Sequence, residues 1–313
     1  MAAISRSDTQ SINENGSFLS NIKWGKILLW IFIALMVFIT AFPFYWVLRT
    51  ALVMPKTVFS DPRSFFPPDP TLFNFQRVLG MIDPTTLVGQ DANNISAGTI
   101  NFWVYLRNSF IVSALITFGQ TIFSTMAAYA FARMKFPLRN QIFFIYLTSL
   151  MIPGIVLTIP NFVLIRQLGW IGTFQGIVAP AFLMSPFAVF FMRQFFLSLN
   201  KDLEEAAVLD GATVFGVFWR IAVPLIQGPI LTLALLTFVA SWNEYLWPFL
   251  VGRDENVRVL TVALNVFQSQ TPQGAPDWAG LMAGTVVGIV PTIVLFIFFG
   301  RRVVDSIQFS GFK

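Results

Sequence analysis

The stretch from Ile27 to Leu48 reads ILLWIFIALMVFITAFPFYWVL and holds 22 residues without a charged side chain. As an α-helix, this length crosses the roughly 30 Å of hydrocarbon in a bilayer. The stretch is too long for the apolar part of a signal peptide, and no A-x-A cleavage site follows it. We therefore interpret it as a retained membrane helix, which makes lipid the expected solvent of this chain.

The same spacing of charges recurs along the sequence. Of its 313 residues, 56% are hydrophobic and 11% are charged, against about a quarter charged in an average soluble protein. Further uncharged intervals lie between Arg107 and Arg133 (25 residues), Arg139 and Arg166 (26), Arg166 and Arg193 (26, with Gly176 to Met192 as the apolar part), Arg220 and Glu244 (23), and Asp277 and Arg301 (23). We predict an all-α integral membrane protein with six transmembrane helices in a domain of residues 27–301.

The distribution of Lys and Arg predicts the orientation of these spans, since an even number places both termini on one side. Segments 1–26, 133–139, 193–220 and 301–313 hold 12 basic residues, whereas the longer segments on the other side hold 8. We therefore expect cytoplasmic tails at 1–26 and 302–313. The pI of about 9.7 then reflects these basic segments, and we predict no nucleic-acid partner.

The external side should carry a long first segment, residues 49–107. It is held extended by Pro55, Pro62, Pro67, Pro68, Pro70 and Pro84. Within it, residues 72–79 have the pattern of a short amphipathic helix, which either lies at the membrane interface or packs on the ends of the spans. Elsewhere, Pro153, Pro160 and Pro291 predict kinks or breaks. Gly280, Gly284 and Gly288 predict a seam for close helix packing.

The composition excludes most catalytic chemistry. With no Cys and no His, the chain lacks thiolate ligands, a thiol nucleophile and the commonest general base, so we expect no metal site. It also lacks the phosphate-binding pattern G-x-x-x-x-G-K-[ST], because Gly25-Lys26 has no glycine at the required position upstream. We therefore predict that the chain is not an enzyme and binds no cofactor of its own.

Polar side chains inside the spans are candidates for a solute path, because such groups are costly in lipid. Ser109, Ser113, Thr117, Gln120 and Ser124 share one face of the second span, and Thr237, Ser241 and Glu244 share one face of the fifth. The first set either lines a hydrated path or forms hydrogen bonds between helices. Trp242, Asn243, Glu244, Tyr245 and Trp247 could bind a sugar through rings, amide and carboxylate, or form an interfacial aromatic belt.

Residues 198–213 have the pattern of two short helices joined by a turn. Asn200 is a good N-cap, and the acids that follow it favour the start of a helix. Asp210-Gly211 should end that helix, because Gly readily takes the left-handed conformation, and Thr213 can cap the next helix. Ala206 and Ala207 leave one side of the first helix nearly bare, so that it could enter a groove of another protein.

This segment resembles a known family. Its order is Glu205-Ala206-Ala207, three residues, Gly211, nine residues, Ile221, one residue, then Val223 where Leu is usual, and Pro224. The spacing is similar to the EAA loop of ABC importer permeases. Further similar stretches are Asn108-Ser109, Met151-Ile152-Pro153 through Leu168-Gly169, Asp210-Gly211-Ala212 and the run from Trp242 to Pro248. From residue 25 on, the chain resembles MalG-type permeases of carbohydrate ABC importers.

The resemblance implies a type I ABC importer permease in a prokaryotic inner membrane, with an EAA coupling loop at 193–224. Glu205, Ala206, Ala207, Asp210, Gly211 and Ala212 would dock in a cleft of the ATPase. The implied partners are a second homologous permease, two copies of a cytoplasmic ATPase that uses ATP and Mg²⁺, and an extracytoplasmic solute-binding protein. The alternative is an ion-coupled secondary transporter, which usually needs more spans and a midplane acid, whereas Glu244 lies at a span end.

Overall fold

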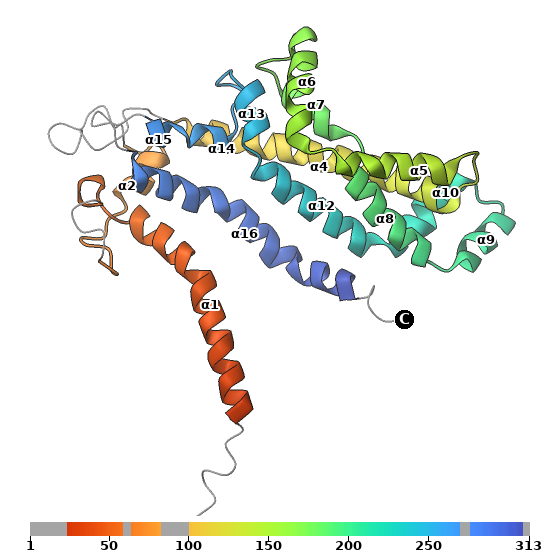
Figure 1. The fold of residues 1–313 in the computed structure, drawn as a ribbon, viewed down its shortest axis with the longest axis horizontal. Coiled ribbons are helices and arrows are strands. Elements are labelled where there is room, and N and C mark those ends of the chain that lie inside the picture. Colours follow the sequence, from red (N-terminus) through yellow and green to blue (C-terminus); the bar gives the residue numbers. More distant parts are fainter. Residues whose placement is uncertain (1–23, 59–63, 83–99, 270–275, 309–313) are drawn as a thin grey trace, which may run out of the picture. The chain divides into compact units, whose positions relative to one another are not determined.

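The computed structural model describes residues 24–58, 64–82, 100–269 and 276–308, and its regular elements within these ranges are helices (Figure 1). The chain divides into two compact units, residues 1–47 and 48–313. Predictions for residues 1–23, for the tail beyond 308 and for parts of 49–107 lie outside the described residues.

The first unit contains most of α1 (Trp24–Ala51), a 28-residue helix that covers the predicted first span. Its apolar side chains are exposed from Ile27 to Phe44, as expected for a helix whose solvent is lipid. Within it, the ring of Phe42 lies 6.0 Å from that of Phe38 and 5.7 Å from that of Trp46. As one continuous helix, α1 forms its backbone hydrogen bonds within itself, which a segment surrounded by lipid requires.

The second unit is built around α4 (Phe102–Arg133), a helix of 32 residues. Packed against it are α7 (Phe174–Phe182), α8 (Pro186–Ser198), α12 (Gln227–Trp242) and α14 (Leu260–Ala263). The long α16 (Trp278–Gln308) packs against α12 and against α2 (Phe73–Val78). α2 and α9 (Lys201–Leu209) lie at opposite ends of this unit (Figure 1), and we use "the α2 end" and "the α9 end" for them.

Three of the predicted spans are bent pairs of helices. α5 (Arg139–Thr148) continues as a 3-10 turn, Ser149–Met151, and meets α6 (Gly154–Gln167) at 97°. α7 and α8 meet at 42°. The segment of α10 (Val214–Val217), a π-turn at Phe218–Ala222 and α11 (Val223–Leu225) meets α12 at 79°. In the described residues, three helices are long enough to cross a membrane, or up to six elements if each bent pair is one span.

The proline and glycine predictions have mixed outcomes. The break before α6 falls at Pro153, as predicted, whereas α6 continues through Pro160 and α16 continues through Pro291. The glycine seam of α16 is confirmed. A Cβ on Gly280 would lie 2.9 Å from the ring of Phe267, one on Gly284 would overlap Leu264, and one on Gly288 would lie 3.3 Å from Leu260. The seam therefore receives side chains of α14, of α15 (Val266–Ser269) and of the linker between them.

The predicted helix at 72–79 forms as α2, and the packing interpretation is correct for it. Val78 is fully buried, and the Asn74 amide donates to the carbonyls of Ala51 (2.9 Å) and Val53 (2.7 Å). A 3-10 turn at Pro55–Thr57 precedes it. α2 is therefore an anchored part of the second unit, not a helix lying free at an interface.

Candidate functional site

A cavity of about 790 Å³ lies beside the middle of α4. Its walls come from α4, α6, α7, α8, α12 and α13 (Leu246–Val251). Its polar lining comprises Gln120, Thr158, Asn161, Ser185, Thr237, Ser241, Glu244 and Trp247. The remaining walls are apolar, so a ligand would meet amide, hydroxyl and carboxylate groups set among hydrocarbon, as is usual for small-molecule sites.

Glu244 and Trp247 hold the entrance of α13 in place. One carboxylate oxygen of Glu244 accepts the backbone N–H of Trp247 at 3.2 Å, which caps the short helix. The backbone carbonyl of Glu244 accepts the hydroxyl of Thr261 at 2.9 Å, and the Trp247 indole donates to the carbonyl of Gly176 at 3.2 Å. Both side chains thus line the cavity from fixed positions.

The structure brings only some of the predicted path residues into this cavity. The predicted residues Gln120, Thr237, Ser241, Glu244 and Trp247 line it, whereas Trp242, Asn243 and Tyr245 do not. Trp242 is buried and donates to the carbonyl of Gly288 at 3.1 Å. The Asn243 amide returns to the carbonyl of Val239 at 2.8 Å, and Tyr245 stacks on Phe249 with ring centroids 5.4 Å apart.

The hydroxyl groups on the polar face of α4 have two kinds of surroundings: some bond to other segments, and others are buried without a partner in the described part of the chain. The hydroxyl of Ser109 accepts from the backbone of Leu260 at 2.8 Å, and that of Ser124 accepts from the backbone of Ser185 at 3.2 Å. These two therefore act as links between segments. Ser113 and Thr117 lie outside the cavity lining, and their buried hydroxyls have no hydrogen-bond partner among the described residues.

Sequence reasoning missed Thr158 and Asn161, which enter the cavity from α6. Both follow the sharp bend at Pro153, and the direction of that bend decides which face of α6 lines the cavity. The available signal was the amide of Asn161 directly after Pro160, inside an uncharged and mostly apolar interval, because such a group needs protein or water beside it.

The predicted helix–turn–helix at the α9 end is confirmed. The Asn200 side chain accepts the N–H of Asp202 at 3.1 Å and begins α9, which ends at Leu209. Gly211 has φ +86°, the left-handed conformation that L-residues with a Cβ avoid. The hydroxyl of Thr213 accepts the N–H of Gly216 at 3.2 Å and begins α10.

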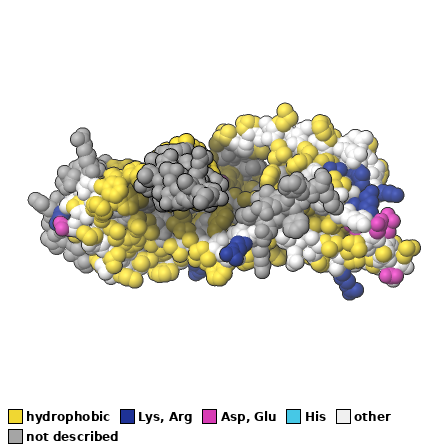
Figure 2. Space-filling model, turned by 90° about the horizontal axis from the view of Figure 1, so that it is seen from below, with side chains coloured by type: hydrophobic (Ala, Val, Ile, Leu, Met, Phe, Trp, Pro, Cys, Tyr) yellow, Lys and Arg dark blue, Asp and Glu magenta, His cyan; other side chains and the backbone are white. Residues whose placement is uncertain are grey.

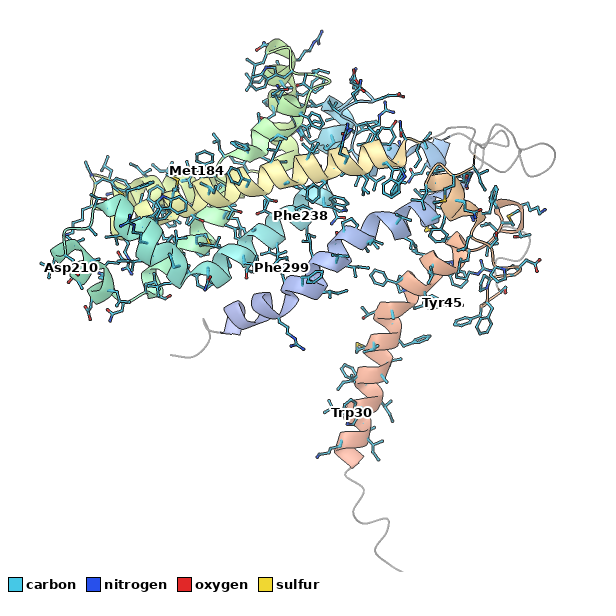
Figure 3. The ribbon with its side chains drawn as sticks, turned by 180° about the vertical axis from the view of Figure 1, so that it is seen from behind. Trp30, Tyr45, Met184, Asp210, Phe238 and Phe299 are labelled. Carbon is cyan, nitrogen blue, oxygen red and sulfur yellow. The ribbon has the colours of Figure 1, made fainter. Side chains whose placement is uncertain are left out.

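The outer face of α9 is available to a partner. Glu205, Ala206, Asp210 and Gly211 are exposed, and Ala207 and Ala212 are partly buried. Leu209 is 89% exposed, and Leu203 and Val208 are exposed beside it, so apolar and acidic groups share one small surface. Asp210 is labelled at this tip in Figure 3, and in Figure 2 acidic and basic side chains gather at the same end.

The inner face of α9 is tied to α4 and α8. The Nε of Arg133, the last residue of α4, lies 2.9 Å from a carboxylate oxygen of Glu204. The same guanidinium donates to the carbonyl of Leu199 at 2.7 Å, and the Tyr129 hydroxyl donates to Glu204 at 3.4 Å. A hollow of about 1420 Å³ adjoins this contact and includes Lys135, Arg139 and Lys201 in its lining.

Comparison with known proteins gives consistent relatives. Residues 120–308 match the family described as binding-protein-dependent transport system inner membrane component. The chain is 36% identical to the arabinooligosaccharides transport system permease protein AraQ of Halalkalibacterium halodurans, over 74% of this chain and 82% of that protein. It is 31% identical to the trehalose/maltose transport system permease protein MalG of Thermococcus litoralis, over 92% and 97%.

A third relative and a solved structure extend this comparison. The sn-glycerol-3-phosphate transport system permease protein UgpE of Salmonella typhi is 30% identical, over 85% of this chain and 91% of that protein. A chain in the crystal structure of a bacterial ABC transporter that imports the acidic polysaccharide alginate has a TM-score of 0.71 at 21% identity, covering 94% of this chain and 99% of the other. The fold is therefore shared with that chain.

Proposed function

The chain belongs to the family of binding-protein-dependent transport system inner membrane components, and we propose that it carries a neutral sugar or a related polyhydroxylated solute. It is a multi-pass membrane protein and a permease of the sugar ABC importer class. This family membership argues against the alternative of an ion-coupled secondary transporter. The observation that carries the choice of solute is the lining of the cavity beside α4.

The cavity suits a neutral solute better than an anionic one. Gln120 and Asn161 supply amides, Ser241 supplies a hydroxyl, and Trp247 supplies a ring that can lie against the face of a sugar. Glu244 accepts hydrogen bonds from hydroxyl groups but repels phosphate or carboxylate. Among the described residues, no Lys or Arg lines this cavity. The named solutes of AraQ and MalG, which are neutral sugars, therefore fit better than glycerol phosphate.

For the α9 end we propose contact with a cytoplasmic ATPase. Glu205 and Asp210 present acidic groups beside exposed Leu209, and the turn at Gly211 gives a tip that can enter a cleft. We propose that the α9 end lies in the cytoplasm and the α2 end outside, and, from the distribution of Lys and Arg, that both termini are cytoplasmic. ATP and Mg²⁺ would be bound by that ATPase and not by this chain.

The proposed assembly holds a second homologous permease, two ATPase copies and an extracytoplasmic solute-binding protein. One solved relative of the same fold, with a TM-score of 0.56, is described as an alginate transporter in complex with a periplasmic protein bound to an alginate pentasaccharide. An assembly of this kind is consistent with the exposed α9 surface and with the apolar outer faces of α5 and α6.

The function is tested by purifying the tagged chain from its native membrane and identifying the chains that come with it. We expect an ATPase and a second permease. In proteoliposomes of the complex with its binding protein, we expect ATP-dependent uptake of a neutral sugar from a set of maltose, trehalose and arabinotriose. Absence of an ATPase, or uptake of sn-glycerol 3-phosphate instead of all three sugars, would overturn the proposal.

The cavity is tested by Asn161→Ala and Glu244→Gln. Glutamine keeps the oxygen that caps α13 but removes the charge. Losing one hydrogen bond to the sugar should raise KM for uptake roughly threefold to tenfold. The control is Tyr245→Phe, which lies outside the cavity lining and should keep wild-type KM. Unchanged kinetics in both cavity variants would contradict this site.

A further inference from the structure

The coupling helix α9 has little packing of its own. None of its nine residues is buried, and the side chains of Leu203, Val208 and Leu209 are more than half exposed. A helix this short is not stable in isolation, because helix nucleation is costly. Its position therefore depends on its caps and on the few contacts of its inner face.

Among the described residues, the ionic contact of that inner face is between Glu204 of α9 and Arg133 of α4. The side chain of Glu204 is 13% exposed, and that of Arg133 is 6% exposed. The Tyr129 hydroxyl supports the carboxylate, and the Tyr129 ring is itself held between Phe196 and Phe218, with centroid distances of 5.2 and 5.1 Å. The carboxylate of α9 is thus received by a rigid part of the unit.

Two neighbouring acids on α9, Glu204 and Glu205, point in different directions. Successive residues of a helix point about 100° apart. Glu204 accordingly meets α4, whereas Glu205 is exposed on the surface proposed to meet the ATPase. One glutamate is placed for a partner and the other for this chain's own scaffold.

The receiving helix also forms a wall of the cavity. Val112, Ile116 and Gln120 of α4 line it, and Arg133 ends the same uninterrupted helix. From Gln120 to Arg133 this helix rises about 20 Å. A displacement applied at Arg133 would therefore reach the cavity wall through one rigid element.

We propose that Glu204 and Arg133 are a positioning pair that makes α9 move as one body with α4. Motion imposed on α9 by the ATPase then shifts the wall that carries Gln120. This inference rests on the proposed function, since it requires a working importer. It assigns to Glu204 a role separate from the docking surface around Glu205.

The first test uses Glu204→Gln in the complete importer, with Asp202→Asn as the matched control on the same helix. Asp202 is exposed, and among the described residues its carboxylate accepts from the Asn200 side chain at 3.1 Å, a bond that asparagine can keep. We expect Glu204→Gln to keep the ATPase bound and hydrolysing, while the amount of sugar imported per ATP falls roughly tenfold. The control should match wild type. If Glu204→Gln imports as much sugar per ATP as wild type, the inference is wrong. If instead no ATPase binds to the wild-type chain, the proposed function is wrong.

The second test stays informative if the single variant does not assemble. The chain contains no Cys, so Arg133→Cys together with Glu204→Cys introduces one defined pair of thiols. Joining them with a short thiol-specific cross-linker should preserve uptake, because the two helices are proposed to move together. Uptake should fall when a cleavable linker is cut. If cross-linking stops uptake, α9 must move relative to α4, and the inference is wrong.

Discussion

Two arginine–carboxylate pairs lie at opposite ends of the second unit and differ in burial. At the α2 end, Arg77 lies 2.5 Å from Asp277, and the side chains are 2% and 0% exposed. At the α9 end, Arg133 lies 2.9 Å from Glu204, and the side chains are 6% and 13% exposed. The same two kinds of charged group are thus fully sealed at one end and slightly more exposed at the other, where the contacting atoms are still buried.

Their surroundings explain what each pair can do. The Arg77 guanidinium lies 5.6 Å from the ring of Phe267, and Asp277 also accepts the N–H of Gly280 at 2.9 Å, which caps α16. In contrast, the Arg133 Nε and the Glu204 oxygen beside it make no hydrogen bond of good geometry among the described residues, and the pair adjoins an open hollow. The Arg77–Asp277 pair fixes two elements through several hydrogen bonds, whereas the Arg133–Glu204 pair joins α9 to α4 beside an open hollow.

The largest expected effect is on the sealed pair. Asp277→Asn leaves the Arg77 charge buried without its counter-ion, which should lower the free energy of unfolding by about 3 to 5 kcal/mol. The measurement is thermal unfolding of the purified protein in detergent. Stability equal to wild type would show that water reaches this site and that the contrast between the two ends is false.

Gly280→Ala should have the next largest effect. An added Cβ would lie 2.5 Å from the Arg77 guanidinium and 2.9 Å from the Phe267 ring, so the pair must shift. Overpacking of this kind costs about 1 to 3 kcal/mol. Gly300→Ala on the same helix is the control, because its nearest neighbour lies at 3.9 Å and the change should cost nothing. Equal stability of both variants would contradict a rigid α2 end.

The sequence predicted local features more fully than distant contacts. The spacing of charges predicted α1, α4 and α16, because hydrocarbon excludes charge from a helix that crosses it. The caps at Asn200 and Thr213 were predicted because each cap bonds a neighbour two or three residues away. Such contacts depend on the local chain alone.

The features that were not predicted depend on how helices are oriented. Arg77 and Asp277 are 200 residues apart, and nothing in the spacing pairs them. The bend at Pro153 was predicted, but its direction, which brings Asn161 to the cavity, was not. Trp242 was a path candidate, yet it donates a hydrogen bond to α16, because the rotation of α12 follows from its packing on α4, α8 and α16.

Glu204→Gln tests the pair at the α9 end, as Asp277→Asn tests the pair at the α2 end. Glutamine preserves shape and an acceptor oxygen, and the remaining Arg133 charge keeps its bond to the carbonyl of Leu199 and its access to the hollow. The loss of stability should be about 1 kcal/mol, well below that of Asp277→Asn. Thermal unfolding of both variants under one condition measures the difference. A cost equal to that of Asp277→Asn would mean that the α9 end is as rigid as the α2 end.

The smallest effect is expected at a third pair, which completes a series in burial. Glu255 is 79% exposed and lies 3.7 Å from Arg258, three residues along the chain. Solvent screens such a pair, so Glu255→Gln should cost no more than about 0.5 kcal/mol. If Glu255→Gln instead costs more stability than Glu204→Gln, the loss of stability does not follow the burial of the three pairs. Their difference would then have to come from hydrogen-bond geometry, in which case repeating the measurements in high salt should leave all three costs unchanged.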